Sequence, residues 1–554
     1  MVNVKNLFGM AVMATALVGC SSNDNLAPDG KDNVGKTGEA YASFTINLPT
    51  TRATRVAGEP SFAEGDAKEY EVKNGTILIF TNDGKFVTSA QLGNMNPWKD
   101  IKTDGVTTAA TATVQLTGVE VGGNYQALVL LNNDVDGAPS KVTLPTSGES
   151  YASWNAKAEN ATAAYTNTDY IFMANAPKYT GTSTEPTTLV PVANICASRE
   201  QAEAQPATTV YVERGLAKVT MQKFNADGYA IAAGTYEGGK VEIKAWQLDV
   251  TNKSTFPVHQ TDGLMTVWNQ IWNTGRFFDA TSSMFQRVYW GKDPNYSGGA
   301  LQDLDACKAA FNMITNDKVV GEAGIENPQY CLENTFDLAN MMQGQTTRVV
   351  FKAVFTPKDF VTGQTFYKIG NTTAIWDATK LAQQIKTVAL KAMKITTADE
   401  QAKYSVDLSK GSNISGVAGL HKITADNITF TGEGKSKVTE DVVNAINDKL
   451  GLTKTGISTY LNGEAYYIAR IKHFNEMTHW NAGEAYGIEN GKYLGRYGVL
   501  RNNWYDLSVN SISGLGYPDV PEVKPTMPDD ENEQFINVEV KILDWAKRSQ
   551  SIDL

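Results

Sequence analysis

The sequence is poor in cysteine and histidine, the residues that most often bind zinc and other transition metals. Among 554 residues there are four cysteines and four histidines, and no two cysteines have the CxxC spacing of a structural zinc site. The four histidines are His259, His421, His473 and His479. His473 and His479 flank Glu476, but no helical pattern around them would bring the three side chains to one face. We therefore expect a surface role for them, and we predict no metal and no cofactor.

Long apolar runs are absent after the first twenty residues, so nothing later in the chain predicts a transmembrane helix. Basic residues are also in the minority, since 49 Lys and Arg face 60 Asp and Glu, which gives a net charge of -11. Such a chain, with no long basic segment, repels nucleic acid. Catalytic motifs of the GxSxG and HExxH types are missing as well, so we predict that the protein is not an enzyme.

Two short motifs are incomplete. The segment 132–137 (NNDVDG) resembles the first half of a calcium loop, but Thr143 stands where the loop needs a bidentate glutamate. The triplet 434–436 (GKS) mimics the end of a phosphate-binding loop, but Thr429 replaces its first glycine. We interpret the first segment as a turn and expect no nucleotide at the second.

The N-terminus carries an export signal. Lys5 precedes an apolar stretch at 7–18, which has the length of a secretory core and is too short to span a bilayer comfortably. The following Gly19-Cys20 resembles the lipobox of bacterial lipoproteins, which implies cleavage between these residues and a lipid on the Cys20 thiol. The lipid chains would add about 0.8 kcal/mol of membrane affinity per buried CH₂. A plain signal peptide with an incidental cysteine is the alternative.

Lipidation of Cys20 would leave an odd number of cysteines for the folded part. These are Cys196, Cys307 and Cys331. Export would permit a disulfide, and Cys307 with Cys331 is the nearer pair. Three buried thiols are the preferred interpretation.

The first regular pattern is a strand at 41–48. Phe44, Ile46 and Leu48 alternate with polar residues and share one face, which predicts a half-buried strand. The polar segment that follows holds Arg52 and Arg55 and few groups that would stabilise it. Such loops are where proteases cut.

Alternating or apolar segments predict further strands at 76–80, 110–116, 125–131, 170–173, 210–221, 241–250 and 503–512, and a hairpin turn at 82–84. Apolar residues at helical spacing predict helices at 377–393 and 439–450 that pack on the sheets. The polar stretch 197–208 marks a domain boundary. No assignment follows from the pattern for 268–344.

The end of the chain combines a spacer with a strand. Four prolines among acidic residues predict an extended, semi-rigid segment at 516–534, about 50 Å long at about 3 Å per residue. The segment 535–545 (FINVEVKILDW) then alternates again. Its shared apolar face consists of Ile536, Val538, Val540 and Ile542. This strand has no hairpin partner nearby in sequence, although it could simply complete its own sandwich.

Several of these features, in this order, resemble the fimbrillins of the Bacteroidetes, the type V pilins, and most closely the structural subunit of short fimbriae. The segments that carry the resemblance are the Cys20 lipobox, the strand 41–48 with its arginine loop, 128–133 (LVLLNN), 212–219 (VERGLAKV), 501–505 (RNNWY) and the whole ending from 516 to 554. The likeness spans the chain and is weakest between 268 and 344.

The resemblance implies a mainly β protein with two tandem transthyretin-like β-sandwich domains and helical insertions in the second. The implied divisions are a signal peptide at 1–19, a lipidated tether and removable strand at 20–55, domains at 56–208 and 209–515, and a spacer with a donor strand at 516–554. It also implies a precursor held in the outer membrane by its lipid, which a trypsin-like, Arg-directed protease cuts after Arg52 or Arg55. Further partners would be copies of the chain, other fimbrial subunits, and host or bacterial surface ligands.

Elementary physics supports this scheme. Removing the strand 41–48 would expose unpaired backbone groups and apolar pockets, and such an edge demands a partner strand. The strand 535–545 of a neighbour has the period to fill it. Donor and acceptor surfaces differ, so the contact does not close and yields a filament. The resemblance implies that this filament is extracellular and supports adhesion and biofilm formation.

Two other functions stay open from the sequence. One is a tip or anchor subunit of the same family. The other is a surface glycan-binding lipoprotein, in which Trp480 or Trp290 would stack on sugars, although aromatic residues more often fill cores.

Overall fold

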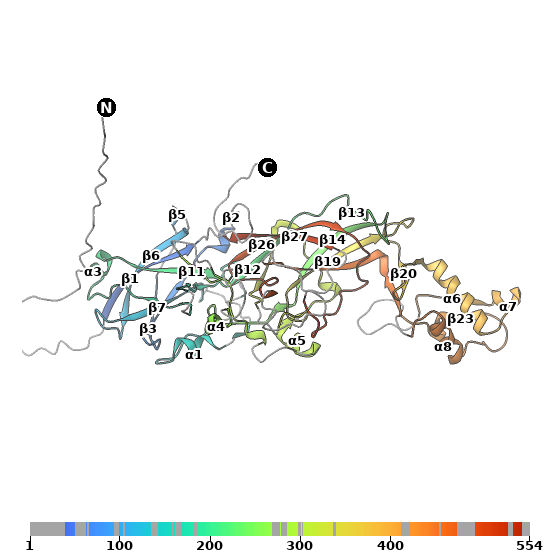
Figure 1. Cartoon of the computed structure of the whole chain (residues 1–554), viewed down its shortest axis with the longest axis horizontal. Coiled ribbons are helices and arrows are strands. Elements are labelled where there is room, and N and C mark those ends of the chain that lie inside the picture. Colours follow the sequence, from blue (N-terminus) through green and yellow to red (C-terminus); the bar gives the residue numbers. More distant parts are fainter. Residues whose placement is uncertain are drawn as a thin grey trace, which may run out of the picture.

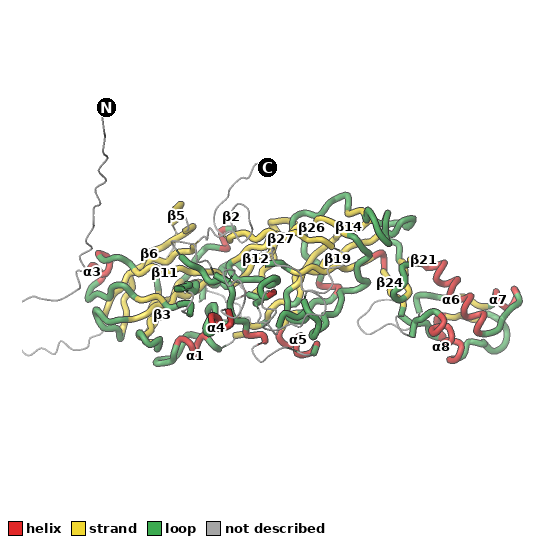
Figure 2. Tube along the Cα trace, viewed as in Figure 1, coloured by secondary structure: helices red, strands yellow, loops and turns green. Residues whose placement is uncertain are grey.

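The protein is built mainly from β-sheets, which follow one another along an elongated molecule (Figure 1). The computed structural model describes residues 39–49, 62–63, 66–93, 99–103, 106–133, 142–157, 159–160, 166, 168–181, 185–268, 277–278, 285–296, 301, 303–335, 340–410, 421–453, 456–473, 493–529 and 536–545. Within these residues an N-terminal sheet, a C-terminal pair of sheets and a lobe with helices lie in succession (Figure 2). This confirms the expected mainly β class.

The N-terminal sheet has nine strands. In spatial order they are β4 (Phe86–Gln91), β3 (Gly75–Thr81), β7 (Tyr125–Leu131), β9 (Met173–Asn175), β11 (Thr208–Arg214), β1 (Glu39–Pro49), β6 (Val106–Thr117) and β5 (Lys99–Thr103), with β10 (Val190–Pro191) beside β7. The sheet curls, since the hydroxyl oxygens of Thr88 in β4 and Thr117 in β6 lie 3.3 Å apart. The predicted β3–β4 hairpin is confirmed, and its turn uses Gly84 at φ 79°.

The segment 210–221, predicted as one strand, is two strands in different sheets. β11 ends at Arg214, and β12 (Leu216–Met221) begins after Gly215. A Cβ at Gly215 would lie 3.4 Å from the Phe172 ring and carbonyl, so a larger residue would crowd this passage. The chain therefore changes sheet at Gly215, seven residues after the expected boundary at 208, because an alternating pattern does not show where a strand leaves its sheet.

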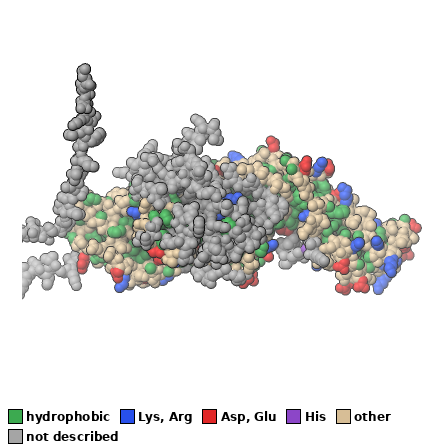
Figure 3. All heavy atoms as spheres, in the orientation of Figure 1, with side chains coloured by type: hydrophobic (Ala, Val, Ile, Leu, Met, Phe, Trp, Pro, Cys, Tyr) green, Lys and Arg blue, Asp and Glu red, His purple; other side chains and the backbone are tan. Residues whose placement is uncertain are grey.

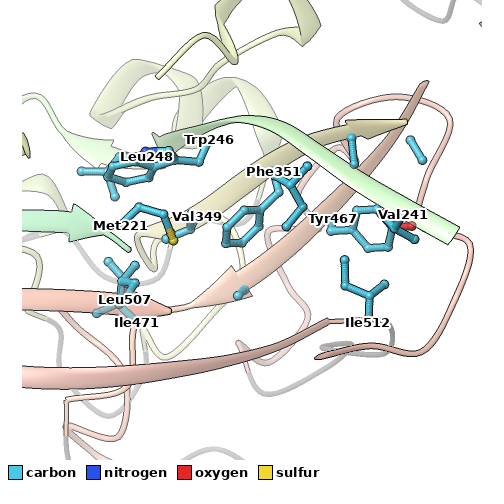
Figure 4. Packing of buried hydrophobic residues seen from close by; sticks show 14 of the residues in the cluster. Met221, Val241, Trp246, Leu248, Val349, Phe351, Tyr467, Ile471, Leu507 and Ile512 are labelled. Carbon is cyan, nitrogen blue, oxygen red and sulfur yellow. The ribbon is translucent and has the colours of Figure 1, made fainter. Parts of the chain in front are cut away.

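The C-terminal part is a sandwich of two sheets. One sheet has the order β18 (Gly324–Leu332), β12, β26 (Asn503–Ile512), β27 (Ile536–Trp545) and β2 (Phe62–Ala63); the other has β13 (Tyr229–Ala230), β14 (Lys240–Asp249), β19 (Arg348–Thr356) and β25 (Glu464–Arg470). Met221 and Leu507 of the first sheet face Trp246 and Phe351 of the second in a shared core (Figure 4). The strands predicted at 241–250 and 503–512 are confirmed.

The two longest described helices lie in a lobe at one end of the molecule (Figure 1). The elements of the lobe are β20 (Phe366–Ile369), β21 (Ile375–Asp377), α6 (Ala378–Ala392), α7 (Ala398–Ala402), β22 (Tyr404–Val406), β23 (Ile428–Phe430), α8 (Glu440–Lys449) and β24 (Ile457–Tyr460). Both predicted helices are confirmed. Asp377 caps α6 by accepting from Lys380 N (2.7 Å), and Thr439 caps α8 in the same way. Acidic and basic side chains both occur on the face of the lobe shown in Figure 3.

The remaining described elements are short. They are η1 (Ala67–Glu69), α1 (Tyr151–Asn155), β8 (Glu159–Asn160), α3 (Arg199–Ala204), β15 (Thr251–Asn252), β16 (Ser254–Thr255), α4 (Leu264–Trp268), η3 (Pro294–Tyr296), α5 (Leu304–Ala310), β17 (Phe311–Asn312), η4 (Asn316–Lys318), η5 (Ala425–Asn427) and η6 (Leu461–Gly463). Several lie in the region 268–344, where the sequence pattern predicted nothing. None of the helices in the described ranges is long and apolar enough to cross a bilayer.

Candidate assembly site

The first described strand, β1, lies inside the N-terminal sheet. It pairs with β6 in antiparallel register from Glu39 to Pro49, and with β11 in parallel register from Phe44 to Asn47. Tyr41 adds two backbone bonds of 2.9 Å with Cys196. An interior strand satisfies backbone groups on both of its edges, so its loss would leave unpaired N–H and C=O groups on both neighbours.

One face of β1 is completely buried. Its side chains are those of Ala40, Ala42, Phe44, Ile46 and Leu48, each at most 1% exposed, within the main core of the sheet. The sequence predicted this face, and the prediction is confirmed. Burying a large apolar side chain contributes about 1.5–3 kcal/mol, so the three largest together contribute about 5–9 kcal/mol. That range overlaps the whole stability of a typical domain, about 5–15 kcal/mol.

The other face of β1 makes specific polar contacts. The Ser43 hydroxyl donates to the Ala202 carbonyl (2.9 Å) and lies 2.8 Å from the Thr113 hydroxyl. The hydroxyls of Thr45 and Thr111 form a second cross-strand pair at 2.9 Å. These contacts fix the register of β1 on β6, because a shift by one residue would exchange the polar and apolar faces.

The expected processing residues lie outside the described part of the structure. They are Gly19 and Cys20 at the lipobox and Arg52 and Arg55 in the arginine loop. The structure describes the elements on either side of that loop. β1 ends at Pro49 in the N-terminal sheet, and β2 begins at Phe62 at the edge of the first C-terminal sheet.

The last strand, β27, pairs with its own chain. Its backbone is antiparallel to β26, from Asn503 opposite Asp544 to Ile512 opposite Ile536. On its outer side, the described pairing is with β2 alone, at Asp544 and Trp545. The alternative that this strand completes its own sandwich therefore describes the isolated chain. The side chains of Ile536, Val538, Val540 and Ile542 lie outside the described part, so their common face stays a prediction.

The Pro-rich segment is not a free, extended arm. Its residues 516–529 follow the surface of the C-terminal sandwich, and Tyr517 pairs with Tyr466 of β25. The prolines favour an extended chain, which predicts a spacer. An extended chain also pairs well with a sheet edge. Only the segment beyond Asp529 separates this docked part from β27.

A buried charge cluster joins the N-terminal sheet to the C-terminal sandwich. Glu213, near the end of β11, lies 2.7 Å from His259 Nδ1 and accepts from Arg287 at 3.0 and 3.1 Å. Glu333 accepts from Arg501 Nε at 2.9 Å. All five side chains are nearly inaccessible to solvent.

Ionisation within this cluster is set by opposing effects. Burial raises the pKa of the Glu213 carboxyl, but the charges of His259 and Arg287 outweigh burial and leave this pKa below its usual value. Burial likewise lowers the pKa of the neighbouring Arg214 to about 10 and raises the pKa of Asp293 to about 7. Oppositely charged side chains of the cluster therefore pair with one another and stabilise the contact between the N-terminal sheet and the C-terminal sandwich.

A second buried contact lies beside the cluster. Glu69 of η1 accepts from Lys218 of β12 at 2.7 Å and from the Tyr330 hydroxyl at 2.5 Å. The Arg214 Nε–H donates to the Glu69 carbonyl at 2.7 Å. No local pattern in the sequence pairs these residues. The available signal was the adjacent charged pair Glu213 and Arg214 at the end of an alternating strand.

Two of the residues considered for metal or sugar binding, His473 and Trp290, lie in the core of the protein. His473 is buried, with Nδ1 2.7 Å from the Tyr505 hydroxyl, so the expected surface role is wrong for it. Glu476 and His479 lie outside the described residues. Trp290 is 1% exposed inside a core cluster and offers no sugar platform, and Trp480 is not among the described residues.

The thiol prediction is confirmed. Of the segment 132–137, which is predicted to be a turn, the structure describes Asn132 and Asn133, and their side chains accept from Lys73 N at 2.8 Å and from Val142 N at 2.7 Å. The turn itself stays a prediction. The three cysteines of the folded part, Cys196, Cys307 and Cys331, are buried thiols that form no disulfide with one another.

The described residues contain no cluster of three or more His, Cys, Asp or Glu side chains suited to a metal ion. A cavity of about 730 Å³ lies between η4 and the Pro-rich segment. Its charged wall residues include Asp249 and Arg348, which bond each other at 2.8 Å. This pair supports the fold.

Comparison with known proteins gives a family for the C-terminal region. Residues 458–551, which include β24 to β27, match the family model of the C-terminal region of fimbrillin, the type IV major fimbrial subunit protein. No curated protein matched.

Several solved structures align with most of the chain, and they come from Parabacteroides, Bacteroides and Porphyromonas species. A candidate cell adhesion protein of Parabacteroides distasonis is 11% identical, with 92% of this chain and 99% of that chain covered and a TM-score of 0.40. One from Bacteroides eggerthii is 12% identical, with 93% and 98% covered and a TM-score of 0.35. The tip fimbrial protein Mfa3 of Porphyromonas gingivalis, truncated at its C-terminus, is 10% identical, with 91% and 100% covered and a TM-score of 0.32. TM-scores below 0.5 do not establish a common fold.

Proposed function

Since the chain belongs to the fimbrillin family by its C-terminal region, we propose that it is a polymerising subunit of a surface fimbria. In this proposal two tandem transthyretin-like domains carry the assembly site, β1 is the strand removed on maturation, and β27 of a neighbouring copy replaces it. The filament lies outside the cell, where it supports adhesion and biofilm formation.

The position of β1 is the observation that carries the proposal. A strand that holds five buried side chains inside a sheet is followed at once by the segment with Arg52 and Arg55. Uncompensated loss of β1 would remove most of the stability of its domain, so the strand has to be exchanged for another. At 10 residues β27 matches the 11 of β1 in length, and its pairing to one strand along its full length leaves it the easier of the two to release.

The same reasoning gives the precursor a temporary anchor. Lipid on Cys20, after cleavage behind Gly19, would hold the chain in the outer membrane through the tether that leads to β1. A trypsin-like, Arg-directed protease acting at Arg52 or Arg55 would cut between β1 and β2. The lipid anchor and β1, which occupies the position between β6 and β11 that a donor strand would fill, would then leave together.

The test is controlled cleavage of the unlipidated full chain (Cys20→Ser). Arg-specific protease should convert the monomer into filaments visible by electron microscopy, with a new N-terminus at Ala53 or Val56. The double variant Arg52→Lys, Arg55→Lys keeps the charge but resists an Arg-specific enzyme, and it should stay monomeric. Trypsin, which also cuts after lysine, should restore filaments from the same variant. Trimmed wild-type chain that stays monomeric would refute the proposal.

The donor strand has its own matched pair of variants. The alternating sequence places Val540 on the apolar face and Lys541 on the other, so Val540→Asp should abolish assembly while Lys541→Asp should permit it. Equal assembly by both variants would show that the apolar face of β27 does not insert into the position that β1 vacates.

A tip or anchor subunit is the second candidate, because β27 already pairs within its own chain. A tip subunit would accept a strand without giving one. Electron microscopy of labelled protein distinguishes the candidates, since a tip or anchor marks one filament end and a major subunit marks the whole length.

A further inference from the structure

The tail that precedes β27 is attached to the C-terminal sandwich at three places. The first lies just after β26. Tyr517 and Tyr466 of β25 exchange two backbone hydrogen bonds of 2.7 and 2.8 Å, so the tail adds a short strand-like pairing to the edge of the second sheet. The Tyr460 hydroxyl also donates to the Gly516 carbonyl at 3.1 Å. This attachment belongs to the sandwich itself and does not involve β27.

The second attachment uses two side chains of the domain body. The amide of Asn316 donates to Asp519 at 2.7 Å and accepts from Val520 N at 2.8 Å, so one side chain holds two consecutive residues. Arg348, which is 3% exposed, donates to the Pro521 carbonyl at 2.6 Å. A charge-assisted bond from a buried arginine is stronger than a bond between neutral groups.

The third attachment is at the far end of the docked tail, where Met342 lies opposite Pro528 in an isolated antiparallel bridge. Two backbone bonds flank this bridge: Gln343 N–H donates to the Met527 carbonyl at 2.9 Å, and Asp529 N–H donates to the Met341 carbonyl at 3.1 Å. The Thr346 hydroxyl adds a bond of 3.2 Å to the Asp529 carboxylate, which is 4% exposed. The tail is therefore held up to the last residue before the undescribed 530–535.

We infer that residues 516–529 stay bound to their own domain during strand donation, and that β27 departs from Asp529. This inference rests on the proposed donation of β27. The backbone of β27 contacts one strand along its length and β2 at its end, whereas the docked tail contacts β25, η4 and the segment 341–348. Release of β27 breaks its ladder with β26 and the short pairing with β2. Release of the tail as well would break three further attachments, although strand donation does not require this.

The point of departure fixes how far the donor can reach. Seven Cα–Cα steps separate Asp529 from Ile536, so the first residue of β27 stays within about 25 Å of the Asp529 backbone. Departure from Ile512 would extend this distance to about 85 Å for the 24 steps involved. The neighbouring subunit therefore has to dock beside the 341–348 segment, which is the interaction surface that the inference assigns to a second copy of this chain.

Two disulfide locks in the unlipidated full chain separate the tail from the strand. Met342→Cys with Pro528→Cys locks the tail. The flanking bonds mark this as a non-hydrogen-bonded antiparallel pair, whose Cα atoms lie about 4.5 Å apart, within disulfide range. Ser508→Cys with Glu539→Cys locks β27 onto β26, since these residues are directly opposite. Mass spectrometry of linked peptides verifies each bond, and the reduced form of each variant is its own folding control.

After Arg-specific cleavage, the tail-locked protein should form filaments at the rate of its reduced form, and the strand-locked protein should form none until reductant is added. Loss of assembly in both oxidised variants, with recovery on reduction, would overturn the inference and leave strand donation intact. Assembly by the oxidised strand-locked variant would instead overturn donation of β27 and, with it, the proposed function.

Discussion

The two terminal strands of this chain have nearly the same length and the same alternating sequence pattern, yet they are held very differently. β1 lies between β6 and β11 with one face fully buried, while β27 pairs with β26 and, among the described strands, meets only β2 on its outer side. Freeing β1 breaks two ladders and exposes its buried core face, whereas freeing β27 breaks its ladder with β26 and the two-residue pairing with β2. In the proposed scheme, this difference assigns β1 to an irreversible step that a protease starts, and β27 to release without cleavage.

The largest expected effect tests the burial of β1. Phe44→Ala in the uncut chain should lower the free energy of unfolding of the N-terminal domain by about 3–5 kcal/mol, because it leaves a cavity in a closed core. Thr45→Ala, on the polar face of the same strand, should cost far less. Urea denaturation followed by tryptophan fluorescence measures both. Equal effects at the two positions would show that β1 is not held by its apolar face.

The sequence predicts that both segments are strands, but it does not predict which strands lie beside each of them. Alternation over 41–48 and 535–545 predicted both strands, because a period of two reports a face that is buried against something. It could not report what lies beside each strand. That β1 is interior follows from its pairing with β6 and β11, which are far away in the chain.

The charge cluster and the docked tail were missed for a related reason. Glu213 meets His259 and Arg287 across 46 and 74 residues, and Asn316 meets Asp519 across 203. Contacts at such separations depend on how the sheets stack, and no local pattern encodes them. Prolines at 518–528 predicted extended chain, but the same extended chain is what lets Tyr517 pair with β25.

A smaller effect tests whether the charge cluster stabilises the C-terminal end of β11, the parallel neighbour of β1, independently of β1. Glu213→Gln should destabilise the protein by about 1.5–3 kcal/mol at neutral pH, because Arg287 loses a charged acceptor in a buried site. In the trimmed chain, which lacks β1, the same substitution should cost at least as much. A cost that vanishes after trimming would mean that β1 itself supports this junction.

The pH dependence of Glu213 gives the sign of that effect. Its pKa in the folded protein lies below the usual 4.5, so its contribution is complete above pH 4.5 and is lost as the pH falls through the lower, folded value. The difference in melting temperature between the wild-type chain and Glu213→Gln should therefore be largest at neutral pH and shrink in acid. A difference that grows in acid would contradict a stabilising ionised Glu213.

The smallest expected effect concerns β2, the two-residue strand that touches the end of β27. It pairs with Asp544 and Trp545, and it lies just beyond the loop that carries Arg52 and Arg55. Ala63→Pro removes a backbone N–H from the pairing segment and should cost about 0.5–1.5 kcal/mol of local stability. Hydrogen exchange at Asp544 and Trp545 should accelerate about tenfold for each 1.4 kcal/mol lost, while exchange in β1 stays unchanged. Ala57→Pro, earlier in the same connection, is the matched control.

If only Ala63→Pro accelerates hydrogen exchange at Asp544 and Trp545, β2 restrains the end of the donor strand. After a cut behind Arg55, β2 begins at the seventh residue of the trimmed chain. The same cut would then loosen both strands, although it falls next to only one of them. If neither variant changes hydrogen exchange in β27, this strand is stabilised by its pairing with β26 alone. The cut then affects β1 and leaves β27 unchanged. The contrast between a strand that must be cut free and a strand that can leave unaided would then be complete.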